Sequence, residues 1–143
     1  MLYLTRRYRF AASHRLDSPA LSAEENARVY GKCNSPYGHG HNYALDVTME
    51  GPVNEATGMV IDLGALDQLV QQEILDRFDH AHLNFDAGLF AQKAPTTENL
   101  CAGIYTLLRE KLEALPARGA ARLHRVRLEE TRSNYFEYED QSV

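Results

Sequence analysis

The hydrophobic pattern of this chain changes period twice, and the order of those changes constrains the fold more than any other feature. Four segments alternate between apolar and polar residues in the manner of half-buried strands: 3–12, 43–50, 123–130 and 135–139. Between them, apolar residues recur at three- and four-residue steps over 63–78 and 100–112, which predicts two amphipathic helices. Helices in the middle and strands at both ends indicate an α+β fold with a mostly antiparallel sheet.

Cap and turn residues fit the boundaries of these elements. Asp62 and Thr97 are expected to cap the N-termini of the two helices, because their side chains accept hydrogen bonds from free backbone N–H groups. The glycines and proline of 51–59 predict a hairpin-like or bulged connection, and Ser133–Asn134 predicts a turn between the last two strands. Residues 18–34 are expected to form a loop with one helical turn.

Length and composition point to one domain that covers residues 1–143. With 143 residues and 44% hydrophobic content, the chain has enough apolar material for one core. It has no apolar run long enough to span a bilayer, and Arg6 and Arg7 stand where a signal peptide needs apolar residues. We therefore expect a cytoplasmic protein without a membrane partner. A formal charge of −5 argues against nucleic-acid binding but leaves room for a small anionic substrate.

The segment CNSPYGHGHNY, residues 33–43, carries the strongest chemical signal. His39 and His41 are separated by one residue where a strand begins, so alternation directs both imidazoles to the same face. His14, at the end of the first predicted strand, can supply a third nitrogen to a zinc site. An isolated HxH is more often a turn with solvated histidines. Here five of the six histidines lie near predicted strand or helix ends, which favours the metal interpretation.

The two cysteines have different surroundings and do not make a disulfide framework. Cys101 falls within the second predicted helix, whereas Cys33 lies in a loop rich in glycine, proline and asparagine, six residues before His39. From the residues alone, Cys33 has two interpretations. It is either a fourth zinc ligand, which would make the site structural, or a free thiol beside an open metal.

Three further polar groups each have a chemical and a purely structural interpretation. Asp79 can orient His80 in a proton-transfer pair, or the two can form an ordinary charged helix C-terminus. Glu129 and Glu130 end a predicted strand, where such pairs are most often solvated. The segment Thr96-Thr97-Glu98 is by itself a helix cap. The residues alone leave these alternatives open.

Six motifs follow one another through nearly the whole chain: FAASH, CNSPYGHGHNY, GMVIDL, FDHAHLN, PTTEN and a late ET. In this order they resemble the 6-pyruvoyltetrahydropterin synthase family, which includes the 6-carboxytetrahydropterin synthases of queuosine biosynthesis. The resemblance implies the tunnelling fold, a four-stranded antiparallel sheet with two helices on one face in the order β-β-α-α-β-β. It also implies that trimers close their sheets into a barrel and stack in pairs as a homohexamer.

The resemblance implies roles for the residues of the predicted metal site. His14, His39 and His41 match the ligands of a catalytic Zn²⁺. Cys33 matches the general base that removes carbon-bound protons, which the metal acidifies by polarising the adjacent oxygen. In this interpretation the thiol stands beside the metal and the open metal position receives the substrate.

Other matched residues complete the implied active site. Asp79 and His80 match a proton relay, which can serve a neighbouring subunit because the active sites of the family lie at subunit interfaces. Glu130 matches the glutamate that anchors the amino-pyrimidine edge of the pterin through paired hydrogen bonds. The segment that matches the lining of the pterin pocket contains Thr96, Thr97 and Glu98.

The implied substrate is 7,8-dihydroneopterin triphosphate, a small-molecule partner of the enzyme in tetrahydrobiopterin biosynthesis. Elimination of triphosphate with internal redox rearrangement gives 6-pyruvoyltetrahydropterin without a nicotinamide. The alternative product is 6-carboxytetrahydropterin, with release of acetaldehyde and triphosphate. Different classes of function remain as alternatives: a non-catalytic zinc-binding module, or a pterin aldolase or epimerase. The cations near the predicted site that can receive phosphates are Arg6, Arg7, Arg9, Arg15 and Lys32.

Two features depart from the family pattern or divide its members. His82 stands where the family commonly has asparagine, which adds an imidazole near the predicted relay. Five residues separate Cys33 from His39, as in the pyruvoyl-forming enzymes, whereas many members of the queuosine pathway have three. The spacing favours pyruvoyl chemistry or a broader, side-chain-cleaving activity.

Overall fold

The computed structural model describes residues 1–140 and contains one five-stranded sheet. The strands are β1 (Leu2–His14), β2 (His39–Gly51), β3 (Ala81–His82), β4 (Arg122–Thr131) and β5 (Asn134–Tyr138), in the spatial order β3-β1-β2-β4-β5. The four long strands pair antiparallel, as predicted, whereas β3 pairs parallel with β1. The α+β class is therefore confirmed, and the fifth strand corrects the expected number. The last three residues of the predicted domain lie outside the described range.

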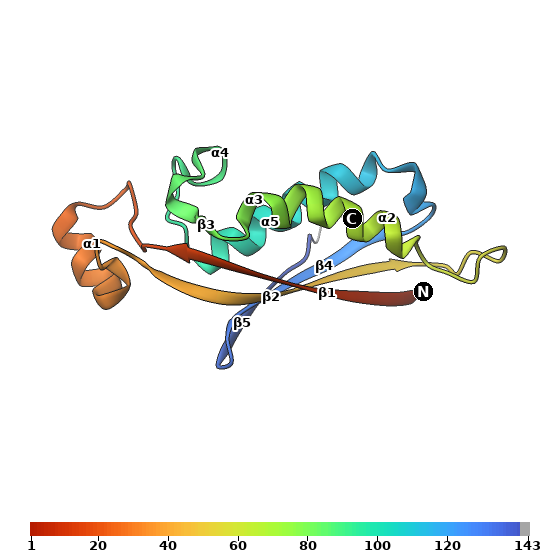
Figure 1. Ribbon diagram of the computed structural model, residues 1–143, viewed down its shortest axis with the longest axis horizontal. Helices are drawn as coiled ribbons and strands as arrows, with labels where there is room; N and C mark the ends of the chain where they lie inside the picture. The colour runs from red at the N-terminus through yellow and green to blue at the C-terminus, as the bar shows by residue number, and fades with distance from the viewer. Residues whose placement is uncertain (141–143) are drawn as a thin grey trace.

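The main helices cover one face of the sheet (Figure 1). The first predicted helix is continuous but changes its winding, from α2 (Leu63–Val70) through a π-helical turn (Gln71–Leu75) to α3 (Asp76–Phe78). The second is α5 (Thr97–Glu113). The core between helices and sheet contains residues with no exposed surface, among them Val47, Leu66, Ile74, Leu108 and Leu128. No helix within residues 1–140 is both long and apolar enough to cross a bilayer.

Several short helices connect these elements, and one of them is longer than expected. The segment predicted to hold one helical turn contains α1 (Ala23–Tyr30), followed by a 3₁₀ turn (Gly31–Asn34). Ser22 caps α1 and Glu25 returns a bond to the Ser22 backbone, so the SAEE sequence forms a reciprocal capping box. The remaining short elements are a 3₁₀ turn (Leu83–Phe85), α4 (Ala87–Phe90) and a 3₁₀ turn (Pro116–Arg118).

The predicted caps and turns are partly confirmed. Asp62 caps α2, as expected, but Thr96 rather than Thr97 caps α5, because the Thr97 hydroxyl is directed into the interior and donates to Glu130. The connection after β2 is a loop closed on itself by the bond from Asn54 N to Met59 O, 2.9 Å, and it leads directly to α2 rather than to another strand. The turn between β4 and β5 falls at Arg132–Ser133, one residue before the predicted position.

The face of the sheet without helices carries charged side chains, many of which form ion pairs with one another. Asp46 and Glu50 on β2 are buried there beneath longer side chains. Arg7 donates to Asp46 from Nε at 2.7 Å, and Arg122 pairs with Glu50. Arginine side chains thus lie over these two carboxylates and neutralise their charges.

Candidate metal centre

Three histidines from β1 and β2 meet on the helix-covered side of the sheet. His14 lies opposite His39 in the antiparallel register, and His41 follows two residues later on the same face. The ring centroids are 4.6 to 5.1 Å apart, and one nitrogen from each ring lies within 4.8 Å of the other two. Alternation along β2 and the pairing of β1 with β2 therefore bring the three imidazoles together.

The protonation pattern of His14 leaves a nitrogen free for a metal. His14 is 1% exposed, and its Nδ1 lies 2.7 Å from the carbonyl oxygen of Pro95, which can only accept. The proton is therefore on Nδ1, and Nε2 carries a lone pair directed at His39 Nε2, 3.0 Å away. Tetrahedral zinc with N ligands at about 2.0–2.1 Å requires nitrogens about 3.3 Å apart. The His14 and His39 nitrogens lie near this spacing, and His41 offers a nitrogen within 4.8 Å of both.

The environment of His14 and His41 favours the neutral imidazole, which is the form that binds metals. Burial lowers the pKa of His14, against the opposing effect of the Pro95 carbonyl. Burial also lowers the pKa of His41, partly offset by the carboxylate of Glu130. His41 Nε2 is buried and has no hydrogen-bond partner among the described residues. A buried nitrogen without a partner beside two other imidazoles fits a zinc ligand.

Glu130 lies at the edge of the three-histidine cluster. Its Oε2 is 3.9 Å from His41 Nε2 and accepts a hydrogen bond from the Thr97 hydroxyl, while Oε1 accepts from Asn134 Nδ2 at 3.2 Å. Burial alone would raise the pKa of Glu130, but these hydrogen bonds and the neighbouring imidazoles outweigh it and hold the pKa below its ordinary value. The carboxylate is thus fixed and ionised next to the histidines.

The start of α5 supports the site from two sides. The carbonyl oxygen of Pro95 accepts a hydrogen bond from His14 Nδ1, and the hydroxyl of the buried Thr97 donates one to Glu130. Thr96 caps the helix by accepting from Asn99 N at 3.2 Å. Glu98 is exposed. Of the predicted pocket-lining residues, Thr97 therefore contacts the carboxylate, Thr96 acts on the helix, and Glu98 faces outward.

Cys33 lies in the 3₁₀ turn before β2, partly exposed and unoxidised. Its carbonyl accepts from Leu16 N at 2.9 Å, and Arg15 Nε donates to Asn34 O at 3.0 Å, so this loop is tied to the residues just after His14. The Cys33 sulfur is outside the group of ligand atoms that converge within 4.8 Å. This geometry favours three histidine ligands and a separate thiol over a four-ligand site.

Asp79 and His80 lie at the outer edge of β1. Asp79 Oδ1 accepts from Ala11 N at 2.9 Å, His80 N donates to Ala11 O at 2.6 Å, and the two side chains are 3.1 Å apart. His80 has φ +62°, an uncommon conformation for a residue with a side chain, and its ring is 84% exposed. A hollow of about 310 Å³ lined by His80 and His41 adjoins this edge.

The cations that were predicted to bind phosphate do not gather at one site in the structure. Arg6 pairs with Asp67 on α2 at 2.9 Å, and Arg7 pairs with Asp46, so the charge of each is already matched by a carboxylate. Arg15 donates to Asn34. Arg9 and Lys32 are exposed.

His82 packs beside the loop that leads to the histidines. Its ring lies 4.8 Å from that of Phe85, and its Nδ1 is buried without a partner among the described residues.

A second cavity lies far from the histidines. It has a volume of about 430 Å³ and surrounds the opposite end of β2, where Glu50, His124 and Glu139 meet. His124 lies 3.4 Å from Glu50 and 3.6 Å from Glu139. Because these lining charges pair with one another, the three-histidine cluster is the stronger candidate for a functional site.

Some residues of the site were not predicted. Pro95 acts through its backbone carbonyl, which no side-chain pattern reveals. Asn134 holds Glu130 from the next strand, and the β4–β5 turn was the only signal for its proximity. Tyr43 belongs to the HGHNY motif, but it received no role from the sequence.

The helices lie on one face of the sheet, and the first two strands present three histidines to one point. Together these features define an α+β protein with a candidate metal centre. The chain matches the family described as 6-pyruvoyl tetrahydropterin synthase over residues 3–141. It belongs to this family, and the resemblance found in the motifs is confirmed.

Individual relatives agree with this assignment. The chain is 41% identical to the 6-pyruvoyl tetrahydrobiopterin synthase of Drosophila melanogaster over 95% of this chain and 78% of the relative, and 41% identical to that of Homo sapiens over 94% and 89%. The structure of Caenorhabditis elegans 6-pyruvoyl tetrahydropterin synthase matches with a TM-score of 0.88 and 35% identity, covering 98% and 96% of the two chains. A putative 6-carboxy-5,6,7,8-tetrahydropterin synthase of Archaeoglobus fulgidus is 36% identical over 66% of this chain and 74% of the relative.

Proposed function

We propose that this chain is a zinc-dependent lyase that converts 7,8-dihydroneopterin triphosphate to 6-pyruvoyltetrahydropterin with loss of triphosphate. The observation that carries the proposal is the convergence of His14, His39 and His41 beside a fixed carboxylate, Glu130. Such a site can hold a metal and a hydrogen-bonding heterocycle side by side. The likeness to named synthases over most of the chain supports the same reaction.

Each residue has a distinct task in this proposal. Bound zinc would supply Lewis-acid polarisation of a substrate oxygen, which acidifies the adjacent C–H bonds. Glu130 accepts hydrogen bonds from the pterin edge, because Thr97 and Asn134 leave lone pairs of its carboxylate free. Cys33, on a loop tied to the residues after His14, removes and returns carbon-bound protons.

The position of His80 supports an assembly in which subunits share sites. Its ring is 84% exposed at the edge of β1, and Asp79 orients it through a contact of 3.1 Å. We propose that this pair serves the zinc of a neighbouring subunit in a hexamer of two trimers, and that residues 1–143 form a single domain.

The closest alternative keeps the site and changes the product to 6-carboxytetrahydropterin. The spacing between Cys33 and His39 and the longer match to the pyruvoyl-forming relatives favour the first product. Incubation of the zinc-loaded protein with 7,8-dihydroneopterin triphosphate, followed by mass spectrometry, separates the two. We expect triphosphate and 6-pyruvoyltetrahydropterin. Release of acetaldehyde would contradict the proposal and support the alternative.

The role of zinc has a test that is independent of turnover. Binding of a metal at a hundred times its Kd stabilises a fold by about 2.7 kcal/mol, so zinc should raise the unfolding temperature of the metal-free protein. We expect His39→Ala to abolish this shift and His124→Ala, at the distant cavity, to retain it. An equal shift in both variants would exclude the three-histidine site as the zinc site.

Cys33→Ala distinguishes the enzyme from a structural zinc module. A thiol that only transfers protons leaves the three nitrogen ligands intact, so the variant should bind zinc as the wild type does and lose turnover. Zinc content by elemental analysis and product formation are measured on the same preparation. Loss of zinc from Cys33→Ala would indicate a four-ligand structural site instead.

A further inference from the structure

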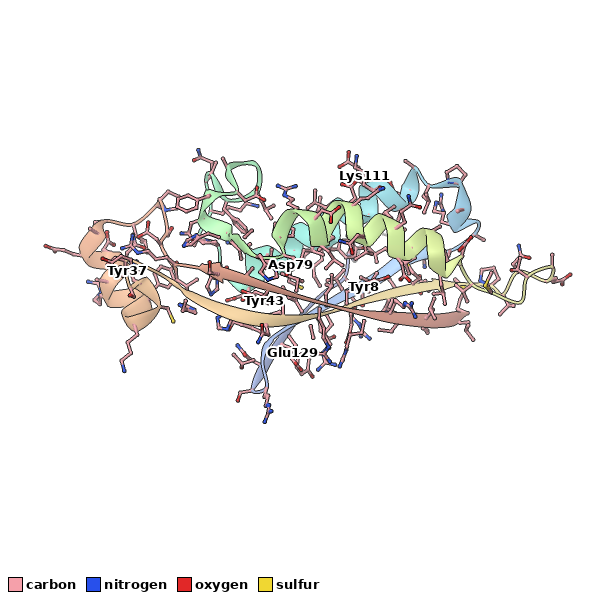
Figure 2. All side chains as sticks on the ribbon, in the orientation of Figure 1. Tyr8, Tyr37, Tyr43, Asp79, Lys111 and Glu129 are labelled. Atoms are coloured by element: carbon pink, nitrogen blue, oxygen red, sulfur yellow. The ribbon has the colours of Figure 1, made fainter. Side chains whose placement is uncertain are left out.

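Tyr43 occupies a core position next to the candidate site. It follows His41 by two residues on β2 and is 1% exposed. Its ring stacks on Phe10 with centroids 5.0 Å apart and an interplanar angle of 19°, and it lies 5.7 Å from the His41 ring. Figure 2 labels Tyr43 in this region of the sheet. The aromatic ring alone explains the packing.

The hydroxyl of Tyr43 has no such explanation. It is buried and has no hydrogen-bond partner among the described residues. A buried hydroxyl without a partner destabilises a fold, and phenylalanine would fill the same space without that penalty. The contrast with Tyr8 is informative, because the Tyr8 hydroxyl donates to Asp67 at 2.7 Å. An unsatisfied hydroxyl at this position therefore suggests a task outside packing.

The polar groups around this hydroxyl belong to the proposed pterin anchor. Ala44 pairs with Glu129 in the sheet, so the antiparallel register places Tyr43 across from Glu130. Burial and the Glu130 carboxylate raise the pKa of the Tyr43 phenol, whereas the nearby Thr97 side chain lowers it. Thr97 is 2% exposed and donates its only hydroxyl proton to Glu130, which leaves its oxygen lone pairs available to a donor.

We propose that Tyr43 is a positioning residue whose hydroxyl donates to Thr97 when a pterin engages Glu130. The resulting chain runs from Tyr43 to Thr97 to Glu130 and directs the Thr97 proton onto the carboxylate. Linked hydrogen bonds polarise one another, so the Thr97–Glu130 bond becomes stronger and more directional. This inference rests on the proposed function, because it requires Glu130 to hold the pterin edge.

The test compares Tyr43→Phe with a matched variant, Tyr8→Phe, by titration of 7,8-dihydroneopterin, which has no triphosphate to lose. We expect Tyr43→Phe to keep its zinc, to unfold at or above the wild-type temperature, and to bind the pterin about tenfold more weakly, the scale of one hydrogen bond to a charged network. KM for the triphosphate substrate should rise by a similar factor with kcat within about twofold. Tyr8→Phe should lower the unfolding temperature and leave pterin affinity unchanged. Wild-type affinity in Tyr43→Phe would overturn the inference.

A double variant tests whether Tyr43 acts on pterin binding through Thr97 or directly. In Thr97→Val, which has no hydroxyl to receive the Tyr43 proton, adding Tyr43→Phe should produce no further loss of pterin affinity. The same tenfold loss in that background would overturn the inference. A wild-type chain that turns over substrate while Tyr43→Phe keeps a normal KM contradicts this inference alone. A wild-type chain that binds pterin without turnover contradicts the proposed reaction alone, and one that binds no pterin contradicts both.

Discussion

Contacts at both ring nitrogens orient His14 within the three-histidine cluster. Nδ1 lies 2.7 Å from Pro95 O, while Nε2 lies 3.0 Å from His39 Nε2. A second partner that fixes the tautomer of a ligand histidine commonly contributes a factor of about 10 to 100 in metal affinity. The carbonyl before α5 is therefore part of the candidate metal centre, even though it contributes no ligand.

Gly38 controls the approach of the loop to His14, which leads to a prediction for Gly38→Ala. A Cβ at this position would lie 2.7 Å from His14 O, and the residue has φ +73°. We expect a loss of about 2–3 kcal/mol of unfolding free energy from the backbone strain and the clash. Zinc affinity should fall by about tenfold or more, because the clash displaces a ligand strand. Chemical denaturation and zinc titration measure the two effects.

Gly58→Ala is the matched control for this substitution. Gly58 also has φ +73°, but no atom lies within 4 Å of the position that its Cβ would occupy. It should lose only about 1–2 kcal/mol from the left-handed backbone and keep full zinc affinity. Equal zinc affinities for the two alanine variants would show that Gly38 does not position the ligands.

At the residue scale, strand alternation was enough to predict that His39 and His41 share a face. The residues that hold these histidines in place were harder to predict, because their contacts join distant parts of the chain. Thr97 was expected to cap its helix, and the structure turns its hydroxyl toward Glu130 instead. Neighbouring threonines satisfy a capping pattern equally well, and only the tertiary fold decides which of them faces inward.

The π-helical turn is the main irregularity among the helices near the site. Residues Gln71–Leu75 widen the helix between α2 and α3, and α3 ends three residues later, just before Asp79. Such turns shift the direction of the residues that follow. Arg77, in α3, then pairs with Asp86 through contacts of 2.7 and 2.8 Å, which closes the short segment that contains His80 and β3.

Asp86→Asn should weaken the contact between Arg77 and residue 86 that closes this segment. Asparagine retains the cap on α4 but loses the ion pair, so we expect a loss of about 1–3 kcal/mol of unfolding free energy at pH 7. The Arg77 guanidinium lowers the pKa of Asp86 in the folded protein. Its stabilisation is therefore present above the unfolded pKa of about 3.9 and is lost as the pH falls through the lower folded value. Denaturation curves should show the wild-type and variant stabilities converging in acid.

Asp62→Asn provides the comparison for this prediction. Asp62 caps α2 by accepting from Ala65 N at 3.2 Å, and asparagine can accept the same bond. We expect a change of less than about 0.5 kcal/mol at pH 7, the usual range for substitutions outside critical contacts. A loss as large as that of Asp86→Asn would show that the cap, rather than the ion pair, provides the stability.

At the element scale, the long strands and both main helices follow from hydrophobic period, but the shorter elements, among them α1 and β3, do not. The SAEE sequence at Ser22 contains the capping-box pattern that begins α1, so this helix had a local signal that the loop-like composition obscured. β3 has only two residues, too few for any period, and its pairing with Ala12 and Ser13 depends on the fold. The parallel addition to an antiparallel sheet was therefore not predictable from the pattern.

At the scale of the whole molecule, the two faces of the sheet have different characters. Helices seal one face over the apolar core (Figure 1). The other face carries paired charges such as Arg7 with Asp46. The proposed hexamer would enclose this charged face within a barrel. The motifs indicated the assembly only through the family resemblance, because edge pairing between copies leaves no period within one sequence.

Mixing of defective subunits tests whether neighbouring chains share sites. We expect Cys33→Ala and His80→Ala each to be inactive alone, and their co-refolded mixture to recover about a quarter of wild-type activity if each site combines one residue from each of two subunits. Size-exclusion chromatography checks that both variants and the mixture assemble alike. A mixture as inactive as its components would place both residues in a site within one chain.

The short pairing of β3 with β1 leaves most of the outer edge of β1 without a strand partner within residues 1–140. It covers the edge of β1 only at Ala12 and Ser13, next to the exposed ring of His80, and within residues 1–140 no other strand pairs with that edge. On the proposed function, a newly synthesised subunit would then carry its metal ligands but depend on an encounter with another copy for its acid–base pair. Specific activity should fall on dilution below the dissociation constant of the assembly, so the supply of subunits in the cell would itself regulate the reaction.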